Sequence, residues 1–479
     1  MTRRELIAIA PAAALAQTGA QRFSGITMMP EYIQVEGIDG VLKNLIERAK
    51  VNAVATSPYV MEPADEKTGS REPPVDADAG KVRLLDRPLW GKRELFVRTA
   101  PAFVPDVRLY QGLKYQPSPA NTLTQKHGAI VRDFLREAKR RGLKTYLQVQ
   151  SAIPPGYRVQ FGGPDKDDAP RLPDGSLLKR RVANNGSLAS RHIVDYHCAL
   201  LRDLAQAYPE VDGFRVDWPE YPPYFLDDVF VDFSDHARAA AARHGLNFER
   251  MQRDASRFYQ YLHGGLDDAA LRQRGQYELM MTLADYPGML DMLRLKALLV
   301  EELLKAFRAA IPREKELMPN AFPPPLSLLS GLDFARISPY SSGISTKLYT
   351  MHWPMMMRFW GDQLQKANPN ISGVLLMEAL EHWLQLGGLP GSRNVTDYRY
   401  PEPNEDHPVS NAAMASKIEA ARRQSKAPVI ALAHGYGPPS DFERRLRVAW
   451  QSSAGRVWVN RYGYLSDRKL DIIGAVCRQ

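Results

Sequence analysis

The sequence has few of the residues that build disulfide-rich, zinc-ribbon or membrane-spanning proteins. Its 479 residues include only two cysteines, Cys198 and Cys477, which rules out a disulfide framework or a cysteine-rich zinc site. No apolar run is long enough to cross a bilayer as a helix, so we expect no stable membrane insertion. The remaining composition, 44% apolar, is that of a folded protein with a large core.

Several catalytic and ligand-binding motifs are also absent. No Gly-x-Gly-x-x-Gly follows the first strand-like segment and no phosphate loop occurs, which argues against nucleotide-binding folds. Gly-x-Ser-x-Gly is missing, so the nucleophile elbow of many hydrolases has no support. His192 and His197 are five residues apart on one expected helix, and His236 and His244 are eight apart on another. Because neither spacing places two imidazoles one turn apart, we predict no metal and no other cofactor.

The charge balance is positive but not clustered. Lys and Arg number 63 against 54 Asp and Glu, a net charge of +9, which favours anionic partners through long-range attraction. The basic residues are scattered and no nucleic-acid-binding motif occurs, so we expect no nucleic-acid partner. The sequence does not indicate the oligomeric state.

Residues 1–16 have the features of an export signal. Arg3 and Arg4 precede a short apolar run, Leu6 to Ala16, which ends in small residues suited to cleavage. Paired arginines before such a run resemble a bacterial twin-arginine (Tat) signal. We therefore predict a periplasmic or secreted protein in which residues 17–479 form a single domain. The alternative is an amphipathic first helix of a cytoplasmic protein.

From residue 24 onward, strand-like and helix-like segments alternate. Eight short segments have the apolar character or two-residue period of strands, and segments of helical period separate them. This pattern predicts an α/β protein with a (β/α)8 barrel, or TIM barrel, and an open doubly wound sheet is the alternative. The predicted strands are 24–29, 51–56, 143–150, 211–217, 316–322, 333–338, 429–433 and 457–462.

Long insertions interrupt this alternation. The periodicity is lost at about 61–124, after the second strand, and again at about 151–190, after the third. Extra helices are expected after the fourth strand, within 234–311. Irregular insertions of this length are usually functional, so we interpret the first as a lid or rim over a site, with an ornamental loop as the alternative. Segment 373–386 fits either a strand that enters a helix or a helix throughout.

The most informative stretch is 211–224, at the end of the predicted fourth strand. Arg215 and Asp217 alternate with apolar residues, and the prolines from Pro219 onward must stop the strand. Asp217 and Glu220 therefore follow a strand end among aromatic rings, where barrel enzymes carry their chemistry. The alternative is a surface turn whose carboxylates pair with nearby bases.

Two carboxylates can cleave a glycosidic bond, one as acid and one as nucleophile or base. We predict Asp217 as nucleophile or base, with Arg215 on the same side of the strand to keep it ionised. Glu220 is the predicted acid, because aromatic surroundings raise the pKa of a carboxyl group. Glu378 is the alternative acid, since it lies at an uncertain element boundary.

The other strand ends carry carboxylates, amides and aromatic rings, the mixture that polyhydroxylated ligands need. We therefore expect a carbohydrate substrate. His352 and His434 fit equally well as structural histidines. The predicted substrate-binding residues are Glu31, Tyr59, Gln148, Gln150, Arg215, Trp218, Tyr221, Asn320, His352, Trp353, His434, Tyr436, Arg461 and Tyr462.

Five residues carry a family resemblance. Gly213-Phe214-Arg215-Val216-Asp217 resembles the fourth-strand motif of the α-amylase-type glycoside hydrolases, which implies that Asp217 is the nucleophile and that Arg215 supports its charge. More broadly, the expected exported barrel resembles bacterial glycosyl-hydrolase-like proteins related to that superfamily. Elsewhere the chain departs from the pattern, with Asn320 in place of the acid Glu and His434-Gly435 in place of His-Asp. The third strand lacks the Asp and Asn-His of the family.

The sequence thus leads to three hypotheses. The first is an exported glycoside hydrolase or close relative that uses strand-end carboxylates. The others are a non-catalytic saccharide-binding barrel and a metal-dependent barrel hydrolase or lyase. The sugar, its linkage and the stereochemical outcome do not follow from residue spacing, because the outcome depends on the distance between the carboxylates.

Overall fold

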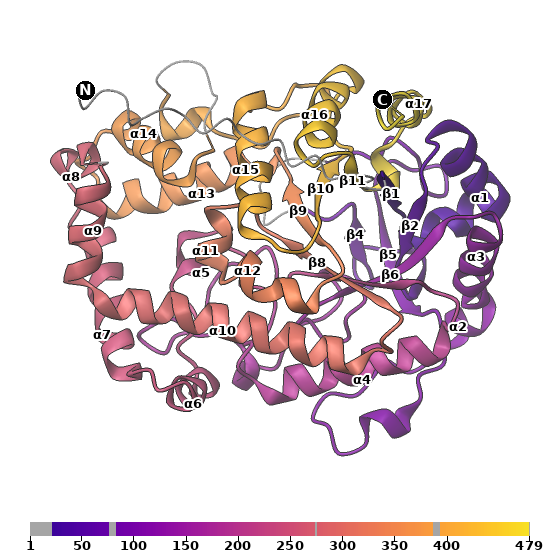
Figure 1. The fold of residues 1–479 in the computed structure, drawn as a ribbon, viewed down its shortest axis with the longest axis horizontal. Helices are drawn as coiled ribbons and strands as arrows, with labels where there is room; N and C mark the ends of the chain where they lie inside the picture. Colours follow the sequence, from indigo (N-terminus) through magenta and orange to yellow (C-terminus); the bar gives the residue numbers. More distant parts are fainter. Residues whose placement is uncertain (1–21, 76–82, 274, 387–392, 479) are drawn as a thin grey trace, which may run out of the picture.

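Eight parallel strands close into a barrel (Figure 1). The computed structural model describes residues 22–75, 83–273, 275–386 and 393–478, so the predicted signal at 1–16 lies outside the described residues. The order β1-β11-β10-β9-β8-β7-β6-β2 makes the first and last strands neighbours and confirms the predicted (β/α)8 barrel. The strands are β1 (Phe23–Thr27), β2 (Ala53–Thr56), β6 (Lys144–Gln150), β7 (Gly213–Asp217), β8 (Glu316–Ala321), β9 (Ile344–Leu348), β10 (Val429–His434) and β11 (Arg456–Asn460).

Amphipathic helices cover the outside of the barrel. In α3 the buried residues Val131, Phe134, Leu135 and Ala138 follow the three- and four-residue spacing of one helix face, which packs inward. The covering helices are α1 (Pro30–Lys43) with its continuation η1 (Asn44–Arg48), α3 (Ala129–Arg140), α4 (Arg191–Ala207), α10 (Pro287–Ala310), α15 (Asn411–Gln424), α16 (Pro439–Ser452) and α17 (Asp467–Val476).

The sixth strand is not at the predicted position. Asp333 caps a short helix, because its carboxylate accepts hydrogen bonds from the backbone N–H groups of Ala335 and Arg336. Segment 333–338 therefore forms α12 (Phe334–Ile337) and enters η4 (Ser338–Tyr340). The sixth barrel strand is β9, in a segment where no strand was predicted from the sequence.

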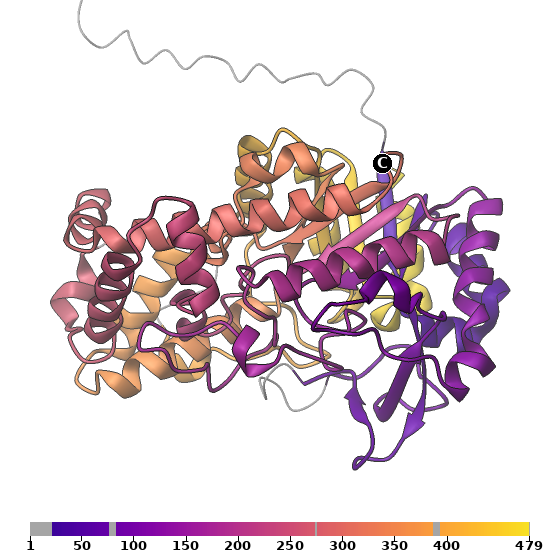
Figure 2. The same ribbon diagram turned by 90° about the horizontal axis from the view of Figure 1, so that it is seen from below.

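The first insertion is more regular than predicted. It contains an antiparallel sheet of order β3-β5-β4, which extends away from the barrel in Figure 2. The second insertion is mostly irregular, as expected. The elements of the two insertions are β3 (Tyr59–Ala64), β4 (Ser70–Glu72), β5 (Leu95–Pro101), η2 (Val107–Tyr110), α2 (Thr122–His127) and η3 (Lys166–Asp168).

Extra helices follow β7, as predicted, and others follow β8 and β9. The ambiguous segment 373–386 is a helix, α14, which Ser372 caps through the backbone N–H of Leu375. Among the described residues, no helix combines the length and apolarity needed to cross a membrane. The remaining elements are α5 (Leu226–Val229), α6 (Asp235–Arg243), α7 (Phe248–Leu262), α8 (Asp268–Arg272), α9 (Gln276–Asp285), α11 (Leu326–Ser330), α13 (His352–Ala367), α14 (Gly373–Leu384), η5 (Val395–Asp397) and η6 (Tyr462–Tyr464).

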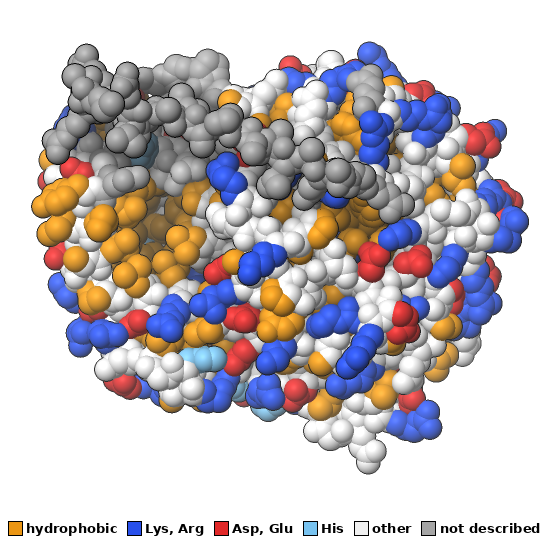
Figure 3. All heavy atoms as spheres, viewed as in Figure 1, with side chains coloured by type: hydrophobic (Ala, Val, Ile, Leu, Met, Phe, Trp, Pro, Cys, Tyr) orange, Lys and Arg blue, Asp and Glu red, His pale blue; other side chains and the backbone are white. Residues whose placement is uncertain are grey.

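The helices α9 and α10 leave an apolar surface exposed (Figure 3). Exposed side chains there include Tyr277, Met280, Met281 and Leu290. They lie beside a hollow of about 1030 Å³ that α9, α10, α11 and α15 line. This hollow shares no lining residue with the cavity at the carboxyl ends of the barrel strands, described below.

The barrel interior is apolar at one level and polar above it. Trp458 and Tyr146 pack edge to face, with ring centroids 5.5 Å apart, among small and aliphatic side chains. Above them, Arg215 lies over the Trp458 ring at 4.1 Å from its centroid. The strand side chains that point inward thus change from packing groups to hydrogen-bonding groups toward the carboxyl ends, where barrel sites lie.

Candidate functional site

A cavity of about 100 Å³ opens at the carboxyl ends of the barrel strands. This is where the sequence predicted the site, because parallel strands bring their ends to one mouth. Seven predicted residues meet there: Gln148, Gln150, Asp217, Trp218, His352, His434 and Arg461. The other lining residues are Met29, Ser57, Pro74, Arg83, Tyr157, Arg158, Val159, Gln160, Tyr349 and Asn460.

Asp217 is the only Asp or Glu among the described residues that line this cavity. Its Oδ1 lies 2.9 Å from Nζ of Lys347, an ion pair across the mouth between β7 and β9. The Lys347 ammonium also lies 5.1 Å from the Trp218 ring centroid and 4.9 Å from that of Phe322, within cation–π range. Lys347 was not among the predicted site residues, because no strand was predicted over β9.

Arg215 lies one level below Asp217 and supports the site indirectly. It is fully buried and donates hydrogen bonds to Oε1 of Gln148 at 3.0 Å and to Oδ1 of Asn320 at 2.9 Å. Burial lowers the pKa of its guanidinium group to about 10. No ion pair joins Arg215 to Asp217 in the described structure, and Lys347 makes the contact that was predicted for Arg215.

Glu220 is buried outside the cavity. Trp218, with φ of 53°, turns the chain sharply after β7 and carries Glu220 behind the mouth. The Glu220 carboxyl group accepts hydrogen bonds from the backbone N–H of Phe322 at 2.9 Å and from the Ser330 hydroxyl at 2.5 Å. Burial raises its pKa to about 7, although the nearby Lys347 opposes the shift. The raised pKa was expected, but the structure does not bring this carboxyl group to the cavity.

The pKa of Glu220 predicts a measurable pH dependence of stability. Its folded-state pKa of about 7 lies above the ordinary 4.5, so between these values the folded protein binds more protons than the unfolded chain. The free energy of unfolding should therefore fall as pH rises through this window, by on the order of 3 kcal/mol from this group. Glu220→Gln cannot titrate, and its stability should decline less in urea unfolding at pH 5 and pH 7.5. The surface variant Glu62→Gln is the control, and parallel declines for wild type and Glu220→Gln would contradict the assignment.

Histidine, phenol and amide groups form another part of the cavity wall. The backbone N–H of Tyr436 donates to Nδ1 of His434 at 3.1 Å, which places the proton of the neutral ring on Nε2. Burial lowers the pKa of His434 well below its usual value, so the ring is neutral at pH 7. Asn460 donates to the Tyr349 hydroxyl at 2.9 Å, and the Tyr349 ring packs against His434 with centroids 5.0 Å apart. The wall thus offers neutral hydrogen-bonding groups.

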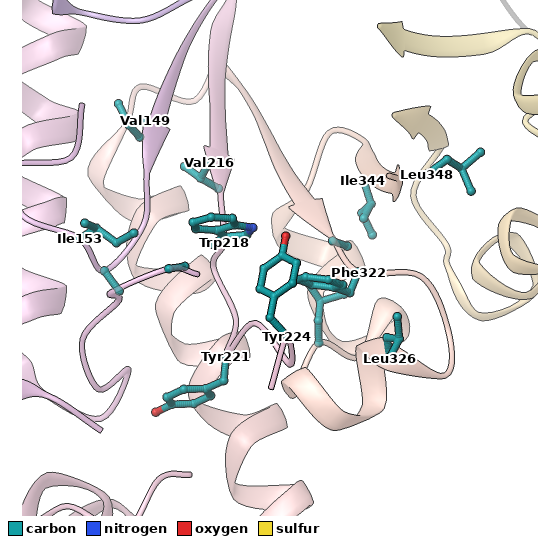
Figure 4. Close-up of a cluster of buried hydrophobic side chains, with 14 of the residues drawn as sticks. Val149, Ile153, Val216, Trp218, Tyr221, Tyr224, Phe322, Leu326, Ile344 and Leu348 are labelled. Atoms are coloured by element: carbon teal, nitrogen blue, oxygen red, sulfur yellow. The ribbon is translucent and has the colours of Figure 1, made fainter. Parts of the chain in front are cut away.

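Figure 4 shows the aromatic groups that follow β7. Trp218 and Tyr224 pack edge to face after β7, with ring centroids 6.1 Å apart, and Phe322 packs against Tyr224. Tyr221 points away from them, and its hydroxyl group donates to Asp232 at 3.1 Å. Of the predicted aromatic pair, Trp218 lines the cavity and Tyr221 does not.

A buried ion cluster extends back from the cavity lining, in which only its two arginines take part. We call it the Glu72 cluster, and its members are Glu31, Tyr59, Glu72, Arg158 and Arg461. Arg158 donates to Glu31 at 3.2 Å, to the Tyr59 hydroxyl at 3.1 Å and to Glu72 at 2.5 Å. Arg461 donates to the other oxygen of Glu72. The predicted residues Glu31 and Tyr59 therefore hold the cationic wall in place and do not line the cavity.

Several other predicted residues also lie outside the cavity lining. Glu378 lies on α14, away from the strand ends in Figure 1. Asn320 accepts a hydrogen bond from Arg215, and the Trp353 ring centroid lies 5.3 Å from Nζ of Lys417. The Tyr436 hydroxyl donates to the Pro401 carbonyl, and the Tyr462 hydroxyl donates to Glu36.

Comparison with known proteins gives a likeness of fold. No protein-family model matches the chain, and a search of curated proteins found no match. The β-galactosidase from the psychrophilic Marinomonas ef1 is similar with a TM-score of 0.48 and 10% identity over 95% of this chain, which spans only 59% of that structure. The catalytic domain of β-amylase from Paenibacillus polymyxa gives a TM-score of 0.46 and 9% identity over 94% of each chain.

A glycoside hydrolase family 18 N-acetylglucosaminidase from Paenibacillus barengoltzii gives a TM-score of 0.38 and 11% identity, covering 95% of this chain and 99% of that chain. The resemblance to glycoside-hydrolase structures is thus distant and concerns the barrel fold. At such identities and TM-scores it does not bear on the reaction.

Proposed function

We propose that this protein is an enzyme that processes a saccharide at the barrel mouth, with Asp217 as the reacting carboxylate. The observation that carries the proposal is the position of Asp217 at the carboxyl end of β7, where it is the only acidic side chain lining the cavity in the described part of the chain. The ring of Trp218 lines the same cavity, and the buried Lys347 pairs with Asp217 and lies 5.1 Å from the centroid of that ring.

Unsatisfied polar atoms in the lining support a polyhydroxylated ligand. Buried polar groups in folded proteins almost always have hydrogen-bond partners, so exceptions at a cavity need an explanation. Hydroxyl groups of a sugar can both donate and accept, and would satisfy both kinds of atom. Side chains that line the cavity include buried atoms without a partner in the described structure: Gln150 Oε1, Tyr157 OH, Gln160 Oε1, Trp218 Nε1 and Arg461 Nε.

The arrangement suits Asp217 for the role of nucleophile or base. Glycosidases generally use a second carboxyl group about 5–9.5 Å from the first, and Glu220 is buried behind the mouth. In our proposal His434 offers its Nε2–H as a hydrogen-bond donor to a saccharide oxygen, since its Nδ1 accepts from the backbone. Export through the signal at 1–16 remains a prediction.

A non-catalytic saccharide-binding barrel is the second candidate. The burial of Glu220 favours it, because the cavity then lacks the usual pair of carboxylates. The cavity of about 100 Å³ is also smaller than the roughly 300–1,000 Å³ of typical ligand pockets. A metal-dependent barrel enzyme is the third hypothesis, but no trio of potential metal ligands lies close together at this cavity among the residues that the structure describes.

A panel of oligosaccharides, including acidic ones, separates these functions. Residues 17–479 are incubated with each sugar, and products are separated by chromatography while affinity is measured by calorimetry. We expect product release from at least one sugar. Binding without products would favour the binding barrel, and neither binding nor products across the panel would contradict both.

A further inference from the structure

A second group of polar side chains lies outside the cavity, where the second insertion meets two helices. Asp168 ends η3, His192 lies in the first turn of α4 and His236 lies in the first turn of α6. Oδ1 of Asp168 is 3.0 Å from Nδ1 of His192 and 3.1 Å from Nε2 of His236. One ligand atom from each residue lies within 4.8 Å of the other two, and none of the three residues lines the cavity.

We propose that Asp168, His192 and His236 bind a zinc-like divalent cation. Zinc bonds of about 2.0–2.2 Å to nitrogen and oxygen place neighbouring ligand atoms about 3–3.5 Å apart, and both Asp–His separations agree with this. The two imidazole rings are nearly perpendicular, at 83°, with centroids 5.7 Å apart, so they converge on the carboxylate without stacking on each other. Two imidazoles and one carboxylate form a common zinc ligand set.

Solvent can complete the coordination. Asp168 is fully buried, whereas the side chains of His192 and His236 are 49% and 29% exposed. An ion can therefore enter from the surface, and water can occupy the fourth position that three protein ligands leave open.

Groups behind Asp168 hold its carboxylate in place. Oδ2 accepts hydrogen bonds from Lys114 at 2.6 Å and from the Tyr115 hydroxyl at 2.8 Å, while Oδ1 also accepts from the Ser190 hydroxyl at 2.5 Å. Such outer hydrogen bonds orient a ligating carboxylate. The Lys114 ammonium occupies Oδ2 and reduces the negative charge, which disfavours Mg²⁺ and Ca²⁺, since these ions require several oxygen ligands.

The cation would fasten three separate segments together. The carboxylate belongs to the 151–190 insertion, and each imidazole belongs to a different helix after β6 or β7. When an ion binds only the folded state, the free energy of unfolding rises with the logarithm of the ratio of the ion's concentration to its dissociation constant. The proposal therefore assigns the site a structural role that is separate from the proposed reaction.

Calorimetric titration and thermal unfolding of the untagged, chelator-stripped protein test the proposal. We expect one Zn²⁺ per chain, a Tm that rises with ZnCl2, and no equivalent effect of MgCl2. His192→Ala and His236→Ala, tested singly and together, should each weaken zinc binding at least about tenfold. Circular dichroism of each variant checks that the fold is retained.

His244→Ala is the matched control. His244 also lies beside a carboxylate, 3.0 Å from that of Glu302, but it does not belong to the group of three potential metal ligands. It should bind zinc as the wild type does. The proposal is overturned if the wild type binds no stoichiometric zinc, or if binding is unchanged in both His192→Ala and His236→Ala. In that case the three side chains form a hydrogen-bonded cluster only.

Discussion

Asp217→Asn is expected to reduce product release on the order of a thousandfold or more, while saccharide affinity changes far less. Asparagine has the same shape as aspartate but is neither a nucleophile nor a base. Because no other described Asp or Glu lines the cavity, none can take over the role. The measurement is kcat and KM for the most active sugar of the panel, with the loss expected in kcat.

The control for Asp217→Asn is the same substitution at the cap of α12. Asp333→Asn keeps a good helix cap and lies outside the cavity, so activity should not change. Because Asp217→Asn leaves Lys347 without its ion pair, thermal unfolding of both variants must show that the fold is retained. Equal product release by wild type and Asp217→Asn would reject Asp217 as the reacting group.

Glu72→Ala is expected to destabilise the protein by about 3–5 kcal/mol. The Glu72 carboxylate is fully buried and binds Arg158 through one oxygen and Arg461 through the other. Its removal leaves two buried guanidinium groups without their shared partner, and a buried unpaired charge costs far more than a surface pair contributes. Urea unfolding measures the loss directly.

Glu62→Ala is the comparison for this prediction. Glu62 pairs with Arg98 at 2.5 Å on the same small sheet, but the Arg98 side chain is 61% exposed, so we expect a loss of at most about 1 kcal/mol. Since Arg158 and Arg461 line the cavity, Glu72→Ala should also weaken saccharide binding, whereas Glu62→Ala should not. Equal destabilisation by the two variants would show that the Glu72 cluster contributes no more to stability than a surface ion pair does.

The barrel was predictable because most strands bury both faces in apolar surroundings and alternate with amphipathic helices. β9 escaped prediction for a physical reason. Its inward residues Ser345 and Lys347 reach the polar upper level of the barrel, where Ser345 meets Arg215 and Lys347 meets Asp217. A strand that points polar groups into a site resembles a loop in sequence.

The candidate site was predictable where it depends on strand ends, as for Gln150, Asp217 and His434. It was not predictable where one residue redirects the chain, as Trp218 does before Glu220. Residues joined only by tertiary pairing were missed as well. Glu72 meets its arginines from a separate sheet, and His192 meets His236 across two helices. No local periodicity encodes such contacts.

The pairing of β1 with β11 has a consequence for protein synthesis. Phe23 to Thr27 align with Arg456 to Asn460, so the first strand emerges from the ribosome long before its partner exists. At about 5–20 residues per second, translation of the 479 residues leaves β1 without this neighbour for roughly 20–100 s. During that time the nascent chain exposes an open strand edge, which is a template for pairing with other chains. We therefore expect chaperones that shield nascent chains to engage this protein until its last strand is released.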